Sequence, residues 1–191
     1  MTITRSLRHR IVFATWAVLL AACSSSSDGG SNTPLDESGF GAKYRLADNE
    51  VAGWTQDPAA GAFATFNAET IFNKIDGAAP PYLEREMRFA LWQQLKGSDP
   101  QNCTLVAMDM TSEANAKSMV ADQQTAQSAS TAIPGYDASV AIASEALGGI
   151  KIFAGFKALY LELILDGFGS DSAAAVQTGV KLLQAEEAKT K

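Results

Sequence analysis

Histidine is almost absent from this sequence. The only one, His9, lies within the first 22 residues, which we expect to be removed as a signal peptide. A mature chain without histidine excludes the Ser-His-Asp triad, the Cys-His dyad and zinc bound through imidazole. It also lacks the side chain best suited to proton transfer near neutral pH. Because there is also no phosphate loop, dinucleotide-binding fingerprint or haem-attachment motif, we predict no cofactor and no metal.

Cysteine is scarce as well, with only Cys23 and Cys103. If Cys23 carries a lipid, as argued below, no intramolecular disulfide can form, although an exported protein reaches a compartment that permits one. Cys103 lies in a predicted strand, and no histidine is available to activate its thiol. A small buried hydrophobic side chain is therefore favoured over a reactive thiol.

Positive charge is in the minority. The chain has 15 Lys and Arg against 21 Asp and Glu, a formal net charge of −6. Loss of Arg5, Arg8 and Arg10 with the signal peptide leaves 12 basic residues (15 less 3) and a net charge of −9. This balance argues against binding to nucleic acid or to an anionic bilayer surface. Attachment to a membrane must then come from acyl chains.

The N-terminus has the three parts of a secretory signal in order: a positive region, an apolar run and small residues before a cysteine. The apolar run, Ile11 to Leu20, falls short of the ~20 residues that a spanning helix needs, so an uncleaved transmembrane anchor is the weaker interpretation. Leu20-Ala21-Ala22-Cys23 resembles the lipobox of bacterial lipoproteins. The resemblance implies a membrane anchor at Cys23, made of acyl chains such as palmitate.

Three regions follow from this interpretation: a signal peptide over residues 1–22, a lipidated tether over 23–39 and one domain over 40–191. Ser24 to Thr33 consists of Ser, Thr, Gly, Asn and Asp, which have little apolar surface to bury, so we expect a flexible tether. Ser24 after the cysteine is similar to the outer-membrane sorting pattern of Gram-negative cells. We therefore expect a membrane-anchored domain that faces the periplasm or the cell exterior.

Apolar periodicity predicts three helices in the domain. The first has Asn67 as N-cap, Gly77 to close it in a left-handed conformation and Pro80-Pro81 to stop its continuation. Its apolar face consists of Ala68, Ile71, Phe72 and Ile75. The second runs over residues 112–124 with Thr111 as its cap, and its inner stripe consists of Ala116, Met119 and Val120.

The third helix lies at the C-terminus, capped by Asp171 or Ser170. Its predicted buried face consists of Val176, Val180 and Leu183. Gly179 costs about 1 kcal/mol relative to alanine in a helix, so we expect it to allow close approach to a sheet.

Alternation with period two predicts the strands. Residues 86–96 and 103–110 form an antiparallel hairpin across a Gly-Ser-Asp-Pro turn. The clearest strand, residues 158–165, has four leucines on one side, and we expect residues 150–153 as its partner with Gly155 at the turn. Residues 139–144 form a further strand, and residues 125–132 are expected to be a loop. This order predicts an α+β domain with a mainly antiparallel sheet of about four to six strands and helices packed against it.

The segment Phe72 to Ala79, which contains Ile-Asp-Gly-Ala-Ala, is followed by Tyr82-Leu83. It resembles the signature of an uncharacterised family of exported bacterial proteins, many of them lipoproteins, catalogued as a domain of unknown function. Gly53-Trp54, Asp109-Met110 and Asn115-Ala116 match further parts of that pattern. The family has no established activity that the resemblance would imply.

The chain departs from the family pattern at Pro80-Pro81, where relatives usually have other residues, and at Lys117, where glycine is expected. These departures bear on the local backbone more than on the family. The order of elements is also similar to the PsbP-like α/β/α sandwich, a likeness of fold that implies no function.

Four residues are candidates for function: Asp76, Gly77, Tyr82 and Trp54. Asp76 lies beside a glycine and two alanines, where a backbone can approach a ligand closely. A structural role is favoured, because the Asp76 carboxylate can bond the turn that ends its helix. Trp54 is an aromatic residue that can line a pocket, although in a domain of this size such residues usually belong to the core.

The leading functional hypothesis is a non-enzymatic lipoprotein domain that binds an envelope protein or a small-molecule ligand. The alternative is a carboxylate-dependent hydrolase centred on Asp76, with Glu84 or Glu86 as its second carboxylate. A deep pocket that brings these carboxylates together would favour the enzyme, whereas an apolar patch would favour the binding module.

Overall fold

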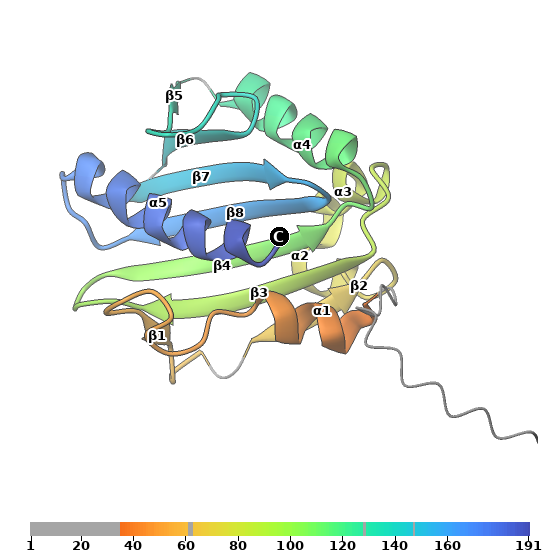
Figure 1. Ribbon diagram of the computed structural model, residues 1–191, viewed down its shortest axis with the longest axis horizontal. Helices are drawn as coiled ribbons and strands as arrows, with labels where there is room; N and C mark the ends of the chain where they lie inside the picture. The colour runs from red at the N-terminus through yellow and green to blue at the C-terminus, as the bar shows by residue number, and fades with distance from the viewer. Residues whose placement is uncertain (1–34, 61–62, 128, 147) are drawn as a thin grey trace, which may run out of the picture. The chain divides into compact units, whose positions relative to one another are not determined.

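One open sheet of eight strands, each antiparallel to its neighbours, dominates the described part of the chain (Figure 1). The structure is a computed structural model that describes residues 35–60, 63–127, 129–146 and 148–191. The expected signal peptide, Cys23 and the tether as far as Pro34 lie outside the described residues. Every element described below lies within one compact unit, Pro34–Lys191.

The spatial order of the sheet is β1-β3-β4-β8-β7-β6-β5, and β2 also pairs with β3. The strands are β1 (Thr55–Gln56), β2 (Ala64–Asn67), β3 (Phe89–Lys96), β4 (Asn102–Asp109), β5 (Ser130–Ala132), β6 (Ala141–Ala146), β7 (Gly149–Phe156) and β8 (Leu159–Asp166). Five α-helices and one 3₁₀ turn are described: α1 (Glu37–Tyr44), α2 (Phe72–Ile75), η1 (Asp76–Ala78), α3 (Pro80–Leu83), α4 (Glu113–Ala126) and α5 (Ser172–Ala188).

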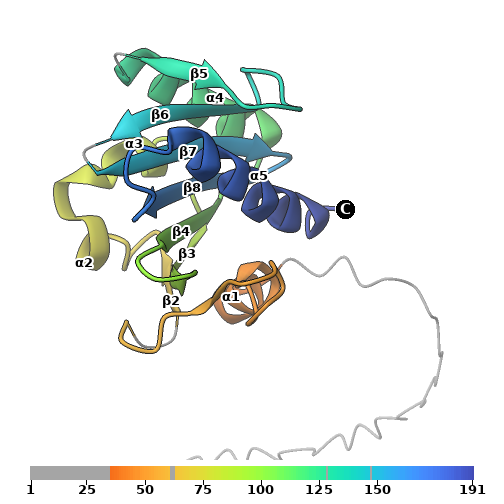
Figure 2. The same cartoon turned by 90° about the vertical axis from the view of Figure 1, so that its left-hand side faces the viewer.

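The two faces of the sheet bury separate hydrophobic clusters. One cluster contains the β8 leucines at positions 159, 161, 163 and 165, and it packs against α1 and α5. The other contains Met108, Phe153 and Tyr160, and it packs against α4 and the α2–α3 segment. Figure 2 shows α1 and α5 on one side of the sheet and α2 and α3 on the other. Helices therefore cover both faces, and both clusters lie within residues 34–191.

The α+β fold, the β3–β4 hairpin and the alternation of β8 are as predicted from sequence. Cys103 is fully buried in β4, as expected, and burial raises the pKa of its thiol. The inner stripe of α4 is buried as predicted, although Ser112 and not Thr111 caps this helix by accepting from Asn115 N. Asp171 caps α5 by accepting from Ala174 N.

Other local predictions were wrong. The sheet has eight strands in place of four to six, and residues 130–132 of the expected loop form edge strand β5. Gly155 is not a turn residue: it lies within β7, where a Cβ atom would be 3.1 Å from the Ala116 carbonyl carbon of α4. The tether was expected to reach residue 39, but α1 begins at Glu37.

The first predicted helix is also shorter than expected. Only Phe72–Ile75 is helical, and Phe72 is 46% exposed, while Asn67 ends β2 and accepts from the backbone of Glu69 and Thr70. Asp76, with φ 44°, supplies the positive-φ residue that had been expected at Gly77. Its ψ of −125° lies outside the left-handed helical region that Asp tolerates, so this residue is strained.

Gly179 on α5 makes the close approach that its position predicts. A Cβ atom there would overlap Ile152 of β7 and come within 3.1 Å of Leu165 Cδ1. We predict that Gly179→Ala lowers the free energy of unfolding by about 1–2 kcal/mol, because overpacking outweighs the gain in helix propensity. Urea denaturation measures this difference. Gly77→Ala is the control, since nothing lies within 4 Å of its added Cβ; equal stability of the two variants would contradict the packing.

Candidate functional site

Three chain segments meet at one end of the sheet, on the right in Figure 1, where β3 begins, β4 ends and β7 turns into β8. Phe89 pairs with Asp109, and Asp109 pairs with Leu159, so these strand ends lie in register. The Met110 amide donates to the Ala158 carbonyl at 2.8 Å, which ties the end of β4 to the β7–β8 turn. Side chains on these segments are therefore held on rigid strands.

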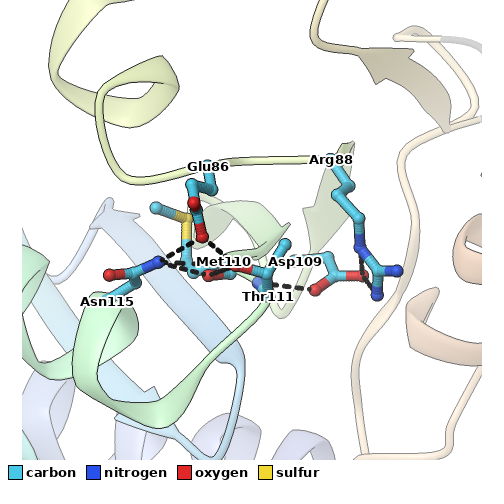
Figure 3. Close-up of polar contacts among 6 residues, drawn as sticks. All are labelled: Glu86, Arg88, Asp109, Met110, Thr111 and Asn115. Atoms are coloured by element: carbon cyan, nitrogen blue, oxygen red, sulfur yellow. Dashed lines mark hydrogen bonds and ion pairs between the residues drawn. The ribbon is translucent and has the colours of Figure 1, made fainter.

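An ion pair between Arg88 and Asp109 lies at this end (Figure 3). The Arg88 Nε and Nη2 atoms donate to Asp109 Oδ2 at 3.1 and 2.6 Å, and the Thr111 amide donates to Oδ1 at 3.0 Å. Both oxygens of this largely buried carboxylate are therefore bonded. Charge-assisted bonds of this kind are about twice as strong as neutral ones, so they fix the position of the guanidinium group.

A second set of contacts joins this pair to the start of α4. The Thr111 hydroxyl is 3.0 Å from Glu86 Oε2 and 2.6 Å from the Met110 carbonyl oxygen, and either can accept its proton. Asn115 Nδ2 donates to the Met110 carbonyl at 3.1 Å and lies 3.4 Å from Glu86 Oε2. Figure 3 shows these side chains converging between the two chain segments. They hold the segment before β3 against α4.

Three residues at this same end of the sheet have strained backbone conformations. Glu86, Thr111 and Lys157 have φ values of 57°, 61° and 51°, a region that side chains other than glycine rarely adopt. Each such residue costs on the order of 1–3 kcal/mol, and Thr111 is β-branched, which makes its case the most unfavourable. Strain of this kind persists only where the surrounding contacts impose it, and it often marks a functional site.

A cavity of about 230 Å³ opens beside the Arg88–Asp109 pair. Its wall is apolar, formed by Leu35, Phe40, Phe156, Ala158 and Leu159. Its polar lining comes from Tyr44, Lys157 and Thr190 together with the ion pair. We call this space the α1 cavity, because α1 supplies both Phe40 and Tyr44.

Tyr44 and Lys157 give the α1 cavity two hydrogen-bond donors. Burial, then the negative charges of Asp109 and Glu186, raise the pKa of Tyr44 to about 12, so its hydroxyl stays protonated. That hydroxyl has no hydrogen-bond partner among the described residues. Lys157 Nζ donates to the Thr190 carbonyl at 2.5 Å and forms no ion pair in the described part of the chain.

None of the four residues singled out from sequence lines the α1 cavity. Asp76 and Gly77 are exposed on the η1 turn. Trp54 is 6% exposed and belongs to the core, where its ring lies against Gly97. Tyr82 is partly buried on α3 at the opposite face of the sheet.

Tyr82 does contribute to a polar cluster of its own. Its hydroxyl donates to Glu162 Oε1 at 2.9 Å, and the Tyr160 hydroxyl donates to the same oxygen at 3.0 Å. Burial raises the pKa of Glu162, although the two tyrosine hydrogen bonds oppose that shift. The cluster anchors α3 to β8, so we assign Tyr82 a structural role.

No shared contact holds the three carboxylates of the hydrolase hypothesis together in the described structure. Asp76 has no side-chain bond in the described structure, Glu84 is exposed, and Glu86 is bonded to Thr111 and Asn115. Among the described residues, no group of three His, Cys, Asp or Glu side chains is placed to hold a metal ion. The sequence had indicated two residues of the observed site, because Asp109-Met110 and Asn115-Ala116 were part of the family pattern, but it gave them no role.

The chain was compared with models of protein families, with curated proteins and with solved structures, and none of the three comparisons found a match. Within the described ranges, no helix combines the length and apolar character needed to cross a bilayer.

A buried carboxylate near the α1 cavity generates a prediction about pH. Glu186 of α5 is fully buried, and its Oε1 pairs with Lys189 at 2.9 Å while Oε2 has no partner. Burial is the main cause that raises the pKa of Glu186 to about 7 from an ordinary 4.5. Because the folded state binds this proton more tightly, the stabilising contribution is present below pH 4.5 and is lost as pH rises through 7.

We therefore predict that Glu186→Gln raises the free energy of unfolding relative to the wild type at pH 8 by up to about 3 kcal/mol. The two proteins should have similar stability at pH 4.5. Urea denaturation at several pH values measures the difference, with the exposed Glu84→Gln as a control that retains the wild-type pH dependence. A constant gap between Glu186→Gln and wild type at all pH values would contradict the prediction.

Proposed function

We propose that the protein is an exported lipoprotein whose α+β domain is a non-enzymatic binding module. In this proposal Cys23 carries the lipid, and the α1 cavity holds a small-molecule ligand. The observation that carries the proposal is the cavity itself, an apolar wall beside donors that have little or no pairing within the protein. Such a combination is typical of small-molecule sites.

Backbone geometry supports this location. Three strained residues, Glu86, Thr111 and Lys157, lie at the end of the sheet that forms the cavity. Folding alone gives no reason to place non-glycine residues in these conformations, because glycine or asparagine would serve at lower cost. Residues of this kind often cluster at functional sites, although Asn49 and Asp76, which also have positive φ, lie outside the cavity lining.

The lining of the cavity does not supply what a two-carboxylate hydrolase needs. Asp109 is the one carboxylate in the lining, and both of its oxygens are bonded by Arg88 and Thr111. A glycosidase requires a second carboxylate roughly 5–10 Å from the first. The geometry therefore supports the binding module better than the hydrolase.

The proposed anchor also limits how far the cavity can lie from the membrane. Leu35, the first described residue, lies in the cavity wall. The 12 residues from Cys23 to Pro34 span at most roughly 40 Å when extended. A lipid on Cys23 would therefore keep the α1 cavity close to the membrane, on the periplasmic or exterior side, and on the outer membrane in a Gram-negative cell.

Replacement of the lipidated residue tests the anchor. We predict that Cys23→Ser moves the protein from the membrane pellet to the soluble or unprocessed fraction, and that it abolishes incorporation of labelled palmitate. Fractionation and metabolic labelling in a bacterial host measure both. Cys103→Ser is the control, because its buried thiol takes no part in the anchor. Palmitate incorporation that survives in Cys23→Ser would contradict the lipidation.

Filling the cavity tests the binding module. We predict that at least one small molecule from a panel of envelope sugars, lipids and amphiphiles raises the melting temperature of wild type but not of Ala158→Leu. A leucine side chain at this position of the cavity wall would occupy part of the space and obstruct a ligand. Ala121→Leu on the exposed face of α4 is the matched control. A ligand that stabilises all three proteins equally would place the binding site elsewhere.

A further inference from the structure

We infer that the ligand of the α1 cavity is a single-chain amphiphile with an anionic head group, a carboxylate or a phosphate monoester. This inference rests on the proposed binding function and names the class of ligand. It follows from the charges at the rim of the cavity, from the conformation of Lys157, and from the size and apolarity of the wall.

The charged side chains at the rim of the cavity, Arg88, Asp109 and Lys157, have a net charge of +1. Arg88 and Asp109 neutralise each other through two hydrogen bonds to one carboxylate oxygen. The ammonium group of Lys157 bonds only the Thr190 carbonyl, so its charge has no carboxylate partner in the described structure. Glu113 and Glu187 line a neighbouring cavity together with Lys157, but Glu113 pairs with Lys117 and Glu187 accepts from Tyr136.

The unpaired charge lies in a chain that is strongly acidic, with 21 Asp and Glu against 15 Lys and Arg. Several other described lysines also lack an ion pair, but Lys157 is the lysine that lines the α1 cavity. Charge-assisted bonds from Lys157 and from the remaining Arg88 nitrogen, Nη1, would satisfy an anionic head group. The Tyr44 hydroxyl adds a neutral donor on the same rim.

The position of Lys157 argues that its side chain is retained for a reason other than folding. Phe156 pairs with Leu159, so Lys157 and Ala158 form a two-residue hairpin turn. Turns of this length strongly favour Asn or Gly wherever φ is positive. Lys157 has φ 51° and an exposed side chain. It is neither of the two residue types, Asn and Gly, that would stabilise the turn.

The wall determines the body of the ligand. Phe40, Phe156, Leu35 and Leu159 present an apolar surface that cannot bond the hydroxyl groups of a sugar. The volume of about 230 Å³ lies below the roughly 300–1,000 Å³ typical of sites for drug-sized ligands. A single alkyl chain is therefore favoured over a diacyl lipid or a multi-ring molecule.

Calorimetric titration of the unlipidated chain, residues 24–191, tests this inference with four probes of equal chain length. The probes are decanoate, decyl phosphate, decanol and decyltrimethylammonium, each below its micelle concentration. We predict that one or both anions bind at least about tenfold more tightly than decanol, and that the cation binds most weakly, because only an anion gains charge-assisted bonds. The two anions separate a carboxylate ligand from a phosphate ligand.

Two variants separate the role of charge from that of the cavity. Lys157→Asn should weaken anion binding about tenfold and leave decanol binding unchanged. Lys96→Asn, at the other end of β3, is the matched control that leaves anion binding unchanged. Ala158→Leu should abolish binding of all four probes.

Two results would overturn the inference, and they differ in what else they affect. Equal affinity of the wild type for decanoate, decyl phosphate, decanol and the cation would disprove the preference for anions and leave the binding module intact. No detectable binding of any probe, together with no stabilising ligand in the melting-temperature panel, would overturn the inference and the proposed function together.

Discussion

The antiparallel alternation of β8 is the constraint on which the rest of the structure depends. Its four leucines face α5 and α1, while Tyr160 and Glu162 face α3 and α4. A strand that is apolar on one face and largely buried on the other must lie near the middle of a sheet with helices on both sides. The neighbouring strands β4 and β7 then both end beside Leu159, the first residue of β8. Their ends frame the α1 cavity.

Local patterns predicted the parts of the fold that local physics determines. The β3–β4 hairpin and the inner stripe of α4 depend on residues near one another in sequence. Two of the three extra strands, β1 and β5, could not be predicted, because they have two and three residues and therefore show no alternation. They are strands only because β3 and β6 offer free edges for pairing. Gly155 was misjudged for the same reason, since only the tertiary contact with α4 requires it.

The site was beyond prediction from sequence because it is assembled from distant segments. Arg88 and Asp109 are 21 residues apart, and Tyr44 and Lys157 come from opposite ends of the domain. Motif spacing instead directed attention to Asp76, whose unusual backbone ends a helix, and to Tyr82, whose hydroxyl fastens α3 to the sheet. Lys157, a charged residue in a two-residue turn, is a further signal of the site that the sequence analysis did not single out. It becomes visible only when the strand ends around Lys157 are known.

In the proposed function, a ligand in the α1 cavity pairs with Lys157, which has no carboxylate partner within the described structure. A crystal structure of residues 24–191 grown with decanoate tests this proposal. We expect decanoate density in the cavity, with the carboxylate within about 3.2 Å of Lys157 Nζ and the chain against Phe40 and Phe156. Decanoate bound at another surface, with an acidic side chain of the protein paired to Lys157, would contradict it.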